Sequence, residues 1–292
     1  PYKRMDFVYR AEFEAGAAAG KRHAFLCFDG LDTVCAIYLN GEKLAETENA
    51  HIGYRFDVTG RLRPGTNALL LIFRSPIEEA AKRQEAFGAR FPAHLGSNFM
   101  FLRKPAYSFF WDWGPELPVS GIFRAATLRA YDRTEIADFQ IRYRITGQDV
   151  AGRVTVEAPG GDGATAVVRI GSARFAAPVV DGRALVPFEI AGAKLWYPNG
   201  EGKPFLYDVT ITLEDGEVLD RREHRVGFRT IEIVRDGRRD GRGKRFVFKV
   251  NGKEIFCRGY NWIPVDNSLP RGYYRLYEGN LDLARDGNVN ML

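Results

Sequence analysis

Residues 24–41 read AFLCFDGLDTVCAIYLNG, and this stretch decides the fold of the first part of the chain. Its apolar runs, 24–28 and 34–39, are separated by a glycine, and each has the length of a β-strand. Asn40-Gly41 follows the second run, and these residue types best tolerate the positive φ that both central positions of a type I′ turn need. The stretch therefore predicts strands and a tight hairpin.

Working outward, the rest of the first ~130 residues continues this pattern with a single interruption. Further strands are expected at 56–59 and 68–73, and the turn-forming residues 63–67 join them. The interruption is a helix. Ser75-Pro76-Ile77-Glu78 has the form of a capping box with proline at the first helical position, and the helix is expected to end at Gly88.

Between Phe91 and Gly121 the sequence has no periodicity and is rich in aromatic residues. Loops longer than ~12–15 residues inside a compact domain are usually functional or disordered, and this one is too aromatic to be disordered. The aromatic residues are Phe99, Phe101, Tyr107, Phe109, Phe110, Trp111 and Trp113.

The middle of the chain predicts a second β domain. Roughly seven short strands in about a hundred residues, without a Cys…Trp…Cys spacing, indicate an immunoglobulin-like sandwich that lacks its disulfide. Its expected strands include residues 139–145, 153–157, 166–170, 206–213 and 224–234.

The last sixty or so residues change to an α/β pattern. A hairpin is expected over 246–257, a helix over 273–285, and the start of another strand over 289–292. A lone strand–helix–strand opening cannot bury its faces, so we expect the natural protein to continue beyond Leu292. The predicted domains are residues 1–130, 131–235 and 236–292.

Composition places the 292 residues among globular proteins, with 45% hydrophobic and 27% charged residues. No apolar run approaches the roughly 18 residues of a membrane span, so no membrane partner is expected. The net charge of +5 is local, because residues 221–245 include ten basic and four acidic side chains. The centre of that segment, 235–243, alternates charge with turn residues and lacks aromatic residues for base stacking. It predicts a linker, and no nucleic-acid partner.

The cysteines and histidines do not indicate a metal site. Cys27, Cys35 and Cys257 form no Cys-x-x-Cys pair, which favours free thiols over a disulfide or zinc site. The four histidines are scattered, so we expect no metal and no cofactor. The chain has no Asn-x-Ser/Thr sequon and no signal-like apolar start, which favours a cytoplasmic location only if Pro1 lies near the true N-terminus.

Short motifs follow one another along nearly the whole chain. The first part holds Tyr38-Leu39-Asn40-Gly41 and Phe56-Asp57-Val58-Thr59, and residues 103–115 read RKPAYSFFWDWGP. Residues 195–200 (LWYPNG), 226–229 (VGFR) and 257–266 (CRGYNWIPVD) continue the series. This ordered set resembles glycoside hydrolase family 2, and segment 103–115 resembles its β-mannosidase branch.

The resemblance implies a mainly β fold. A jelly-roll, galactose-binding-like domain without its N-terminal strand and an immunoglobulin-like β-sandwich would precede the truncated start of a (β/α)8 barrel. It implies a retaining exo-β-mannosidase that removes terminal non-reducing β-D-mannose from oligosaccharides, with two carboxyl groups about 5–5.5 Å apart. In the family these are glutamates on later barrel strands. Glu254 and Glu278 match neither motif, so no catalytic residue is assigned and the chain alone is expected to be inactive.

The resemblance makes Asp112 the main candidate for substrate binding. In the family this loop reaches the barrel mouth, and its aspartate accepts hydrogen bonds from hydroxyls of the mannose in the cleaved position. A carboxylate suits that role because it accepts charge-assisted hydrogen bonds. Trp111 and Trp113 could offer apolar faces to the sugar ring. The alternative is a packed aromatic corner in which Asp112 is bonded to backbone.

Arg258, Asn261 and Trp262 are the second group of candidates, because they follow the expected first barrel strand. Asn261 could hold a sugar hydroxyl and Trp262 could form a wall of the pocket. The alternative is a loop that seals the barrel against the sandwich. Trp196 and Tyr197 lie within the expected sandwich, and a structural role is favoured for both.

Departures from the family pattern leave rival functions open. Residues that family members carry before the position of Pro1 are absent, and Phe110 stands where glycine is common. The rivals are another family 2 exo-glycosidase, such as a β-galactosidase or exo-glucosaminidase, and a non-catalytic carbohydrate-binding module. Nothing in the sequence indicates an oligomeric state.

Overall fold

The computed structural model describes residues 2–88, 98–110, 114–237, 241, 243–266 and 275–292. The chain divides into two compact units. The first unit comprises Pro1–Asp132 and Pro264–Glu278, and the second comprises Arg133–Ile263 and Gly279–Leu292. Within the described ranges, no helix is both long and apolar enough to cross a membrane.

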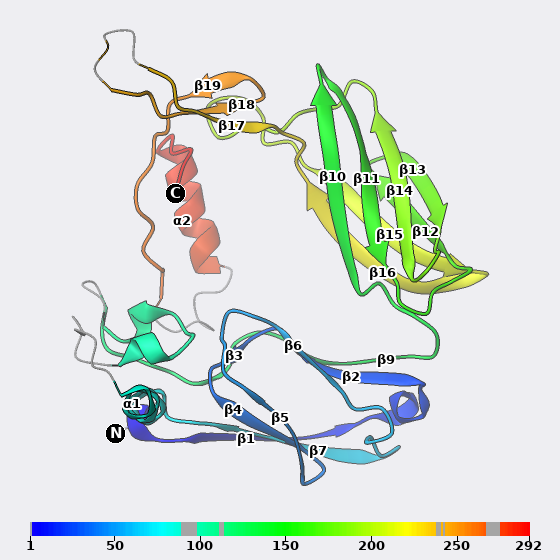
Figure 1. Cartoon of the computed structure of the whole chain (residues 1–292), viewed down its shortest axis with the longest axis vertical. Helices are drawn as coiled ribbons and strands as arrows, with labels where there is room; N and C mark the ends of the chain where they lie inside the picture. Colours follow the sequence, from blue (N-terminus) through cyan, green and yellow to red (C-terminus); the bar gives the residue numbers. More distant parts are fainter. Residues whose placement is uncertain (1, 89–97, 111–113, 238–240, 242, 267–274) are drawn as a thin grey trace. The chain divides into compact units, whose positions relative to one another are not determined.

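The first unit is built on two antiparallel sheets (Figure 1). One has the order β1 (Phe7–Glu14), β7 (Thr66–Phe73), β4 (Cys35–Leu39), β5 (Glu42–Thr47). The other has the order β6 (Tyr54–Asp57), β2 (His23–Phe28), β9 (Ala126–Tyr131). Buried side chains from both sheets, including Phe28, Ile37 and Phe73, form one hydrophobic cluster. The predicted β4–β5 hairpin is confirmed, with φ of 54° at Asn40 and 88° at Gly41.

Strand β1 was not predicted from the sequence. It pairs along its whole length with β7, from Phe7 opposite Phe73 to Glu14 opposite Thr66. Phe7 and Phe13 pack against the hydrophobic cluster, while most of the strand is exposed. Pairing across some sixty residues of sequence, rather than a local signal, places this strand at the edge of the sheet.

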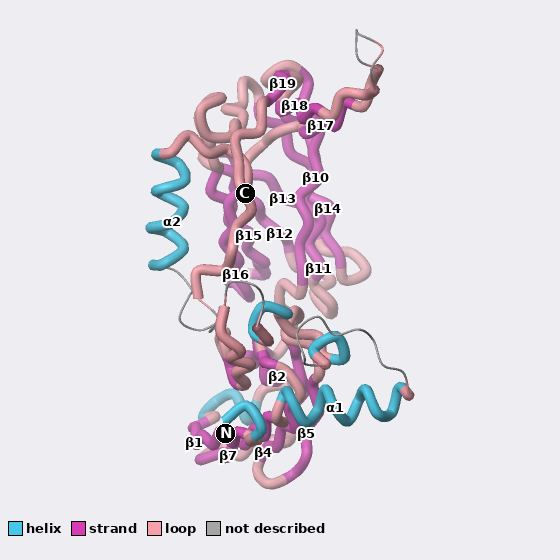
Figure 2. Tube along the Cα trace, turned by 90° about the vertical axis from the view of Figure 1, so that its left-hand side faces the viewer, coloured by secondary structure: helices cyan, strands magenta, loops and turns pink. Residues whose placement is uncertain are grey.

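Helix α1 (Pro76–Phe87) forms where it was predicted (Figure 2), but the capping box is only half formed, because the Ser75 N–H donates to Asp6 Oδ1 and not to Glu78. The Ser75 hydroxyl accepts a hydrogen bond from the Glu78 N–H at 3.2 Å, and Gly88 ends the helix with φ of 74°. Ala80 is buried against Leu102 and Phe109, which belong to the aromatic segment that follows.

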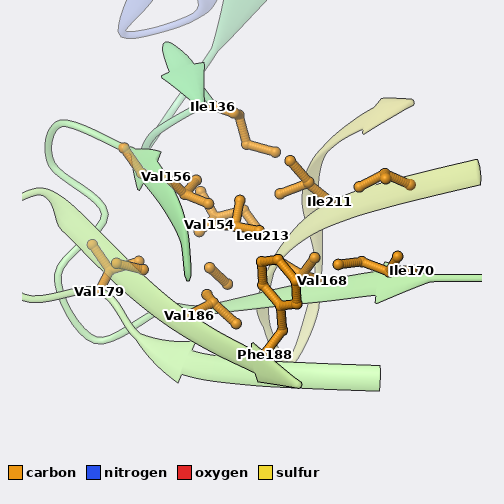
Figure 3. Close-up of a cluster of buried hydrophobic side chains, with 14 of the residues drawn as sticks. Ile136, Val154, Val156, Val168, Ile170, Val179, Val186, Phe188, Ile211 and Leu213 are labelled. Carbon is orange, nitrogen blue, oxygen red and sulfur yellow. The ribbon is translucent and has the colours of Figure 1, made fainter. Parts of the chain in front are cut away.

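The second unit contains the sandwich. A sheet of β10 (Asp138–Thr146), β11 (Asp149–Glu157) and β14 (Arg183–Ile190) faces a second sheet across the core (Figure 1). The second sheet has the order β13 (Ala173–Pro178), β12 (Thr165–Ile170), β15 (Tyr207–Asp215), β16 (Glu217–Val226). Figure 3 shows Val154, Phe188 and Ile211 among the side chains between them. The three cysteines are not joined by disulfides, and burial raises the pKa of the Cys35 thiol to about 12.

The expected single strand over 224–234 is wrong. Strand β16 ends at Val226, and β17 (Ile231–Val234) pairs instead with β18 (Val247–Val250), which pairs with β19 (Lys253–Ile255). The break falls where the chain packs tightly, because a Cβ on Gly227 would lie 2.9 Å from Trp196. Phe228 then turns its buried ring into the sandwich core.

The end of the chain forms helix α2 (Arg275–Asp286), as predicted, and the strands expected on either side of it are reduced to an isolated bridge. Gly259 and Met291 form a parallel bridge, and the Asn290 N–H donates to the Arg258 carbonyl at 2.9 Å. The bridged position before the helix is therefore Gly259, which follows the predicted 246–257 hairpin. Glycine is needed there because a Cβ would lie 2.2 Å from the Met291 carbonyl oxygen.

Candidate functional site

The segment that carries the main candidates, residues 99–123, is here called the aromatic loop. The ring of Phe109 is fully buried and packs with Leu102 and the α1 residue Ala80. This small apolar cluster fixes the chain just before residues 111–113. Trp111, Asp112 and Trp113 themselves lie outside the described residues.

Backbone contacts join the two sides of the aromatic loop. Phe109 and Glu116 form an antiparallel bridge, and the Leu117 N–H donates to the Ser108 carbonyl at 2.9 Å. Nearer the start of the loop, Arg103 forms a parallel bridge with Asn49. The two sides of the loop are thus paired at residues 108–109 and 116–117.

A buried ion pair lies at the base of the aromatic loop. The ammonium of Lys104 lies 3.0 Å from both carboxylate oxygens of Asp32 and donates to the Val119 carbonyl at 2.6 Å. Burial lowers the pKa of Lys104, and the negative charge of Asp32 opposes that effect. All three donors of the ammonium therefore have an acceptor within the protein.

Tyr107, in the same loop, also has a perturbed pKa. Its pKa is raised to about 12, first by burial and then by the nearby groups Tyr277, Asp32 and Asp266. The phenol consequently stays protonated at any physiological pH. Tyr277 and Asp266 come from the 264–278 segment, which belongs to the same compact unit as Tyr107.

Arg258, one of the predicted substrate contacts, is engaged with its own unit. Its Nε donates to the Asn288 carbonyl at 3.0 Å, and its terminal nitrogens lie 3.4 Å from Glu201 Oε1 and the Asn199 carbonyl. Its backbone N–H donates to Asn290 Oδ1 at 2.8 Å. These contacts engage the guanidinium within its own unit, and a contact of Arg258 with substrate stays a prediction.

Two residues that were not predicted from the sequence, Asn199 and Glu201, accept hydrogen bonds from Arg258. Asn199 Nδ2 donates to the carbonyls of Arg285 at 2.9 Å and Val289 at 3.1 Å, at the end of α2. Lys253 also lies 2.8 Å from Glu201, and its side-chain hydrogen bond is the main cause of the lowered pKa of Glu201. The only sequence signal was their place beside the Trp196-Tyr197 motif.

Asn261 and Trp262 come shortly after Arg258 in the sequence. Asn261 is exposed, and Trp262 is partly buried. Trp196 has the structural role expected of it. Its backbone N–H donates to the Phe228 carbonyl at 2.9 Å, and its backbone carbonyl accepts from the side-chain amide of Asn251 at 3.0 Å.

The second unit also has a cavity of about 560 Å³ at one end of the sandwich. Its polar lining includes Gln148, Lys194, Glu232 and Asn251, and does not include Asn261 or Trp262. Within the described part of the chain, no three His, Cys, Asp or Glu side chains gather as a metal site. The candidate site therefore consists of the aromatic loop and the residues that pack against it.

Comparison with known families decides the assignment of the two β units. The family described as "Glycosyl hydrolase 2 galactose-binding domain-like" matches residues 2–124. "Glycosyl hydrolases family 2" matches residues 126–229. The chain belongs to glycoside hydrolase family 2.

Curated relatives within family 2 extend the match to almost the whole chain. "Beta-mannosidase B" of Aspergillus terreus is 33% identical over 98% of this chain, and the same-named protein of Aspergillus niger is 32% identical over 98%. The chain spans 35% of the length of each of these relatives.

Solved structures agree with the fold. A β-D-mannosidase from Dictyoglomus thermophilum covers 99% of this chain with a TM-score of 0.89 and 33% identity, and this chain covers 37% of it. A β-glucuronidase from Ruminococcus gnavus covers 87% of this chain, with a TM-score of 0.60 and 21% identity. The second likeness shows the fold alone. The mainly β architecture followed by an α/β opening is that of family 2.

Proposed function

We propose that this chain is the accessory and barrel-opening part of a retaining exo-β-mannosidase, which removes terminal β-D-mannose from oligosaccharides. The observation that carries the proposal is the match over 99% of the chain to the Dictyoglomus β-D-mannosidase, at a TM-score of 0.89. The β-glucuronidase likeness is weaker at 0.60. The catalytic carboxyl pair would then come from the part of the relatives that this chain does not match.

The role proposed for the described residues is to support the substrate loop. The buried Phe109 and the paired sides of the aromatic loop would hold the Trp-Asp-Trp sequence, and Asp112 would accept hydrogen bonds from mannose hydroxyls. Trp111 and Trp113 would exclude water from the sugar ring. Asn261 would hold a sugar hydroxyl and Trp262 would form a wall of the pocket, while the guanidinium of Arg258 already has acceptors in Asn199, Glu201 and Asn288.

The test is an activity panel on the product of the complete reading frame. Aryl β-mannoside should be cleaved with a higher kcat/KM than aryl β-galactoside, β-glucuronide or β-glucosaminide. The 292-residue chain, assayed in parallel, should show no turnover. A preference for any of the other glycosides would replace the β-mannosidase assignment with another family 2 activity.

A further inference from the structure

The feature that the proposed function leaves unexplained is the buried ion pair between Lys104 and Asp32. The side chains are 0% and 3% exposed, so both charges are removed from water. Such a pair is weak evidence for stability, because an apolar pair of similar volume often stabilises a protein as well or better. The pair therefore calls for another role, and its contacts indicate one.

Asp32 lies where both ends of the aromatic loop meet. Its backbone belongs to β3 (Leu31–Asp32), which pairs with β8 (Gly121–Ile122) at the end of the loop, with Asp32 opposite Gly121. Its carboxylate binds Lys104, near the start of the loop. Strand β3 thus contacts the end of the aromatic loop through its backbone, and it contacts the start of the loop through the Asp32 side chain.

Lys104 also links the start of the aromatic loop to its end. Its ammonium spans from the Asp32 carboxylate to the carbonyl of Val119, fifteen residues further along the chain. The ammonium also lies 5.5 Å from the centroid of the buried Phe109 ring, a cation–π distance. Its directed donors therefore fix the separation of residues 104 and 119, which apolar packing alone would define less sharply.

We propose that Lys104 and Asp32 are positioning residues, which hold the two ends of the aromatic loop at a fixed separation and so set the position of the loop toward a β-mannoside. This inference rests on the proposed function for its substrate. The part that concerns the loop ends stands on the geometry alone. Neither residue is assigned a contact with the sugar.

The first experiment measures the loop ends in the 292-residue chain, without any activity. The double variant K104M/D32N removes both charges together, so that no unpaired charge stays buried. Chymotrypsin should cleave it between residues 105 and 118 about tenfold faster than wild type, at the aromatic residues there. The variant K104Q/D32N keeps an N–H donor for the Val119 carbonyl and should be cleaved at a rate closer to wild type.

A matched control comes from the sandwich. Arg222 contacts Asp220 at 2.7 Å and the buried Glu135 at 3.7 Å, and it donates to the Ile136 carbonyl at 2.9 Å, so it is also a cation between carboxylate and carbonyl groups. The variant R222M/D220N should lose thermal stability without a change in cleavage between residues 105 and 118. Equal cleavage rates in K104M/D32N and wild type would overturn the proposal.

The second experiment measures substrate positioning in the product of the complete reading frame. At an assay temperature well below its melting temperature, K104M/D32N should have a kcat/KM for an aryl β-mannoside about tenfold or more below that of wild type. Most of this loss should come from a higher KM. R222M/D220N should keep the wild-type kcat and KM. Unchanged kinetics beside faster loop cleavage would overturn the positioning role alone. A wild-type product that cleaves no β-mannoside would instead overturn the proposed function, and the cleavage rates would still decide the role at the loop ends.

Discussion

The charge of Asp112 is the residue-scale feature on which the proposed substrate contact depends. Asp112→Asn keeps the size of the side chain and removes the charge. Because a hydrogen bond to a charged group contributes about 1.5–3 kcal/mol, kcat/KM for an aryl β-mannoside should fall roughly 10- to 100-fold. Steady-state kinetics on the product of the complete reading frame would measure this.

The control for Asp112→Asn is Asp162→Asn, which makes the same change at an exposed turn in the sandwich. Both variants should melt close to the wild-type temperature, because neither charge is expected to stabilise the fold by more than about 0.5–1 kcal/mol. A kcat/KM for Asp112→Asn within twofold of wild type would remove Asp112 from the substrate site.

At this same scale, the sequence suggests some candidate residues and gives no sign of others, for a physical reason. Asp112 is proposed through the resemblance of its motif and stays a prediction, because it lies outside the described residues. Lys104 was not singled out, because a lysine in a sequence is normally a solvated cation, and only its burial against Asp32 shows otherwise. Arg258 has its acceptors in segments near Asn199 and Asn288, which no local pattern joins to it.

At the scale of elements, the sequence predicted those features that depend only on residues close together in the chain. The Asn40-Gly41 turn and the Ser75 cap each depend on residues within a few positions, and the structure has both. Strand β1 depends on β7, far away in the sequence, and was missed. The 224–234 strand was wrong because Gly227 leaves the sheet to pack against Trp196, a contact that periodicity does not encode.

Strand β14 offers a prediction about the sandwich core. Phe188 is 2% exposed, and its ring centroid lies 6.0 Å from those of Phe175 and Phe228. Phe188→Ala should lower the free energy of unfolding by about 3–5 kcal/mol, through lost contacts and a cavity. Urea denaturation should show a lower midpoint, with the same slope, for the transition of the sandwich.

The same strand supplies the control for Phe188→Ala. Leu185 lies on the opposite face of β14 and is 51% exposed, so Leu185→Ala should change stability by less than about 0.5 kcal/mol. Equal losses in the two variants would mean that the alternation along β14 does not separate core from solvent.

At the scale of the whole molecule, each compact unit has a hydrophobic cluster of its own. Phe73 is fully buried in the cluster of the first unit, and Phe188 belongs to that of the second. Each unit has a chain length typical of an independently folding domain, about 100–150 residues. We therefore expect scanning calorimetry of the 292-residue chain to show two unfolding transitions.

Variants in each core assign these transitions to the units. Phe73→Ala should move one transition to lower temperature and leave the other in place, and Phe188→Ala should do the reverse, because each substitution opens a cavity in only one cluster. A shift of about 4–8 °C per kcal/mol, typical of domains of 60–100 residues, becomes somewhat smaller at the size of these units. A single transition that both variants displace equally would show instead that the two clusters unfold as one cooperative structure.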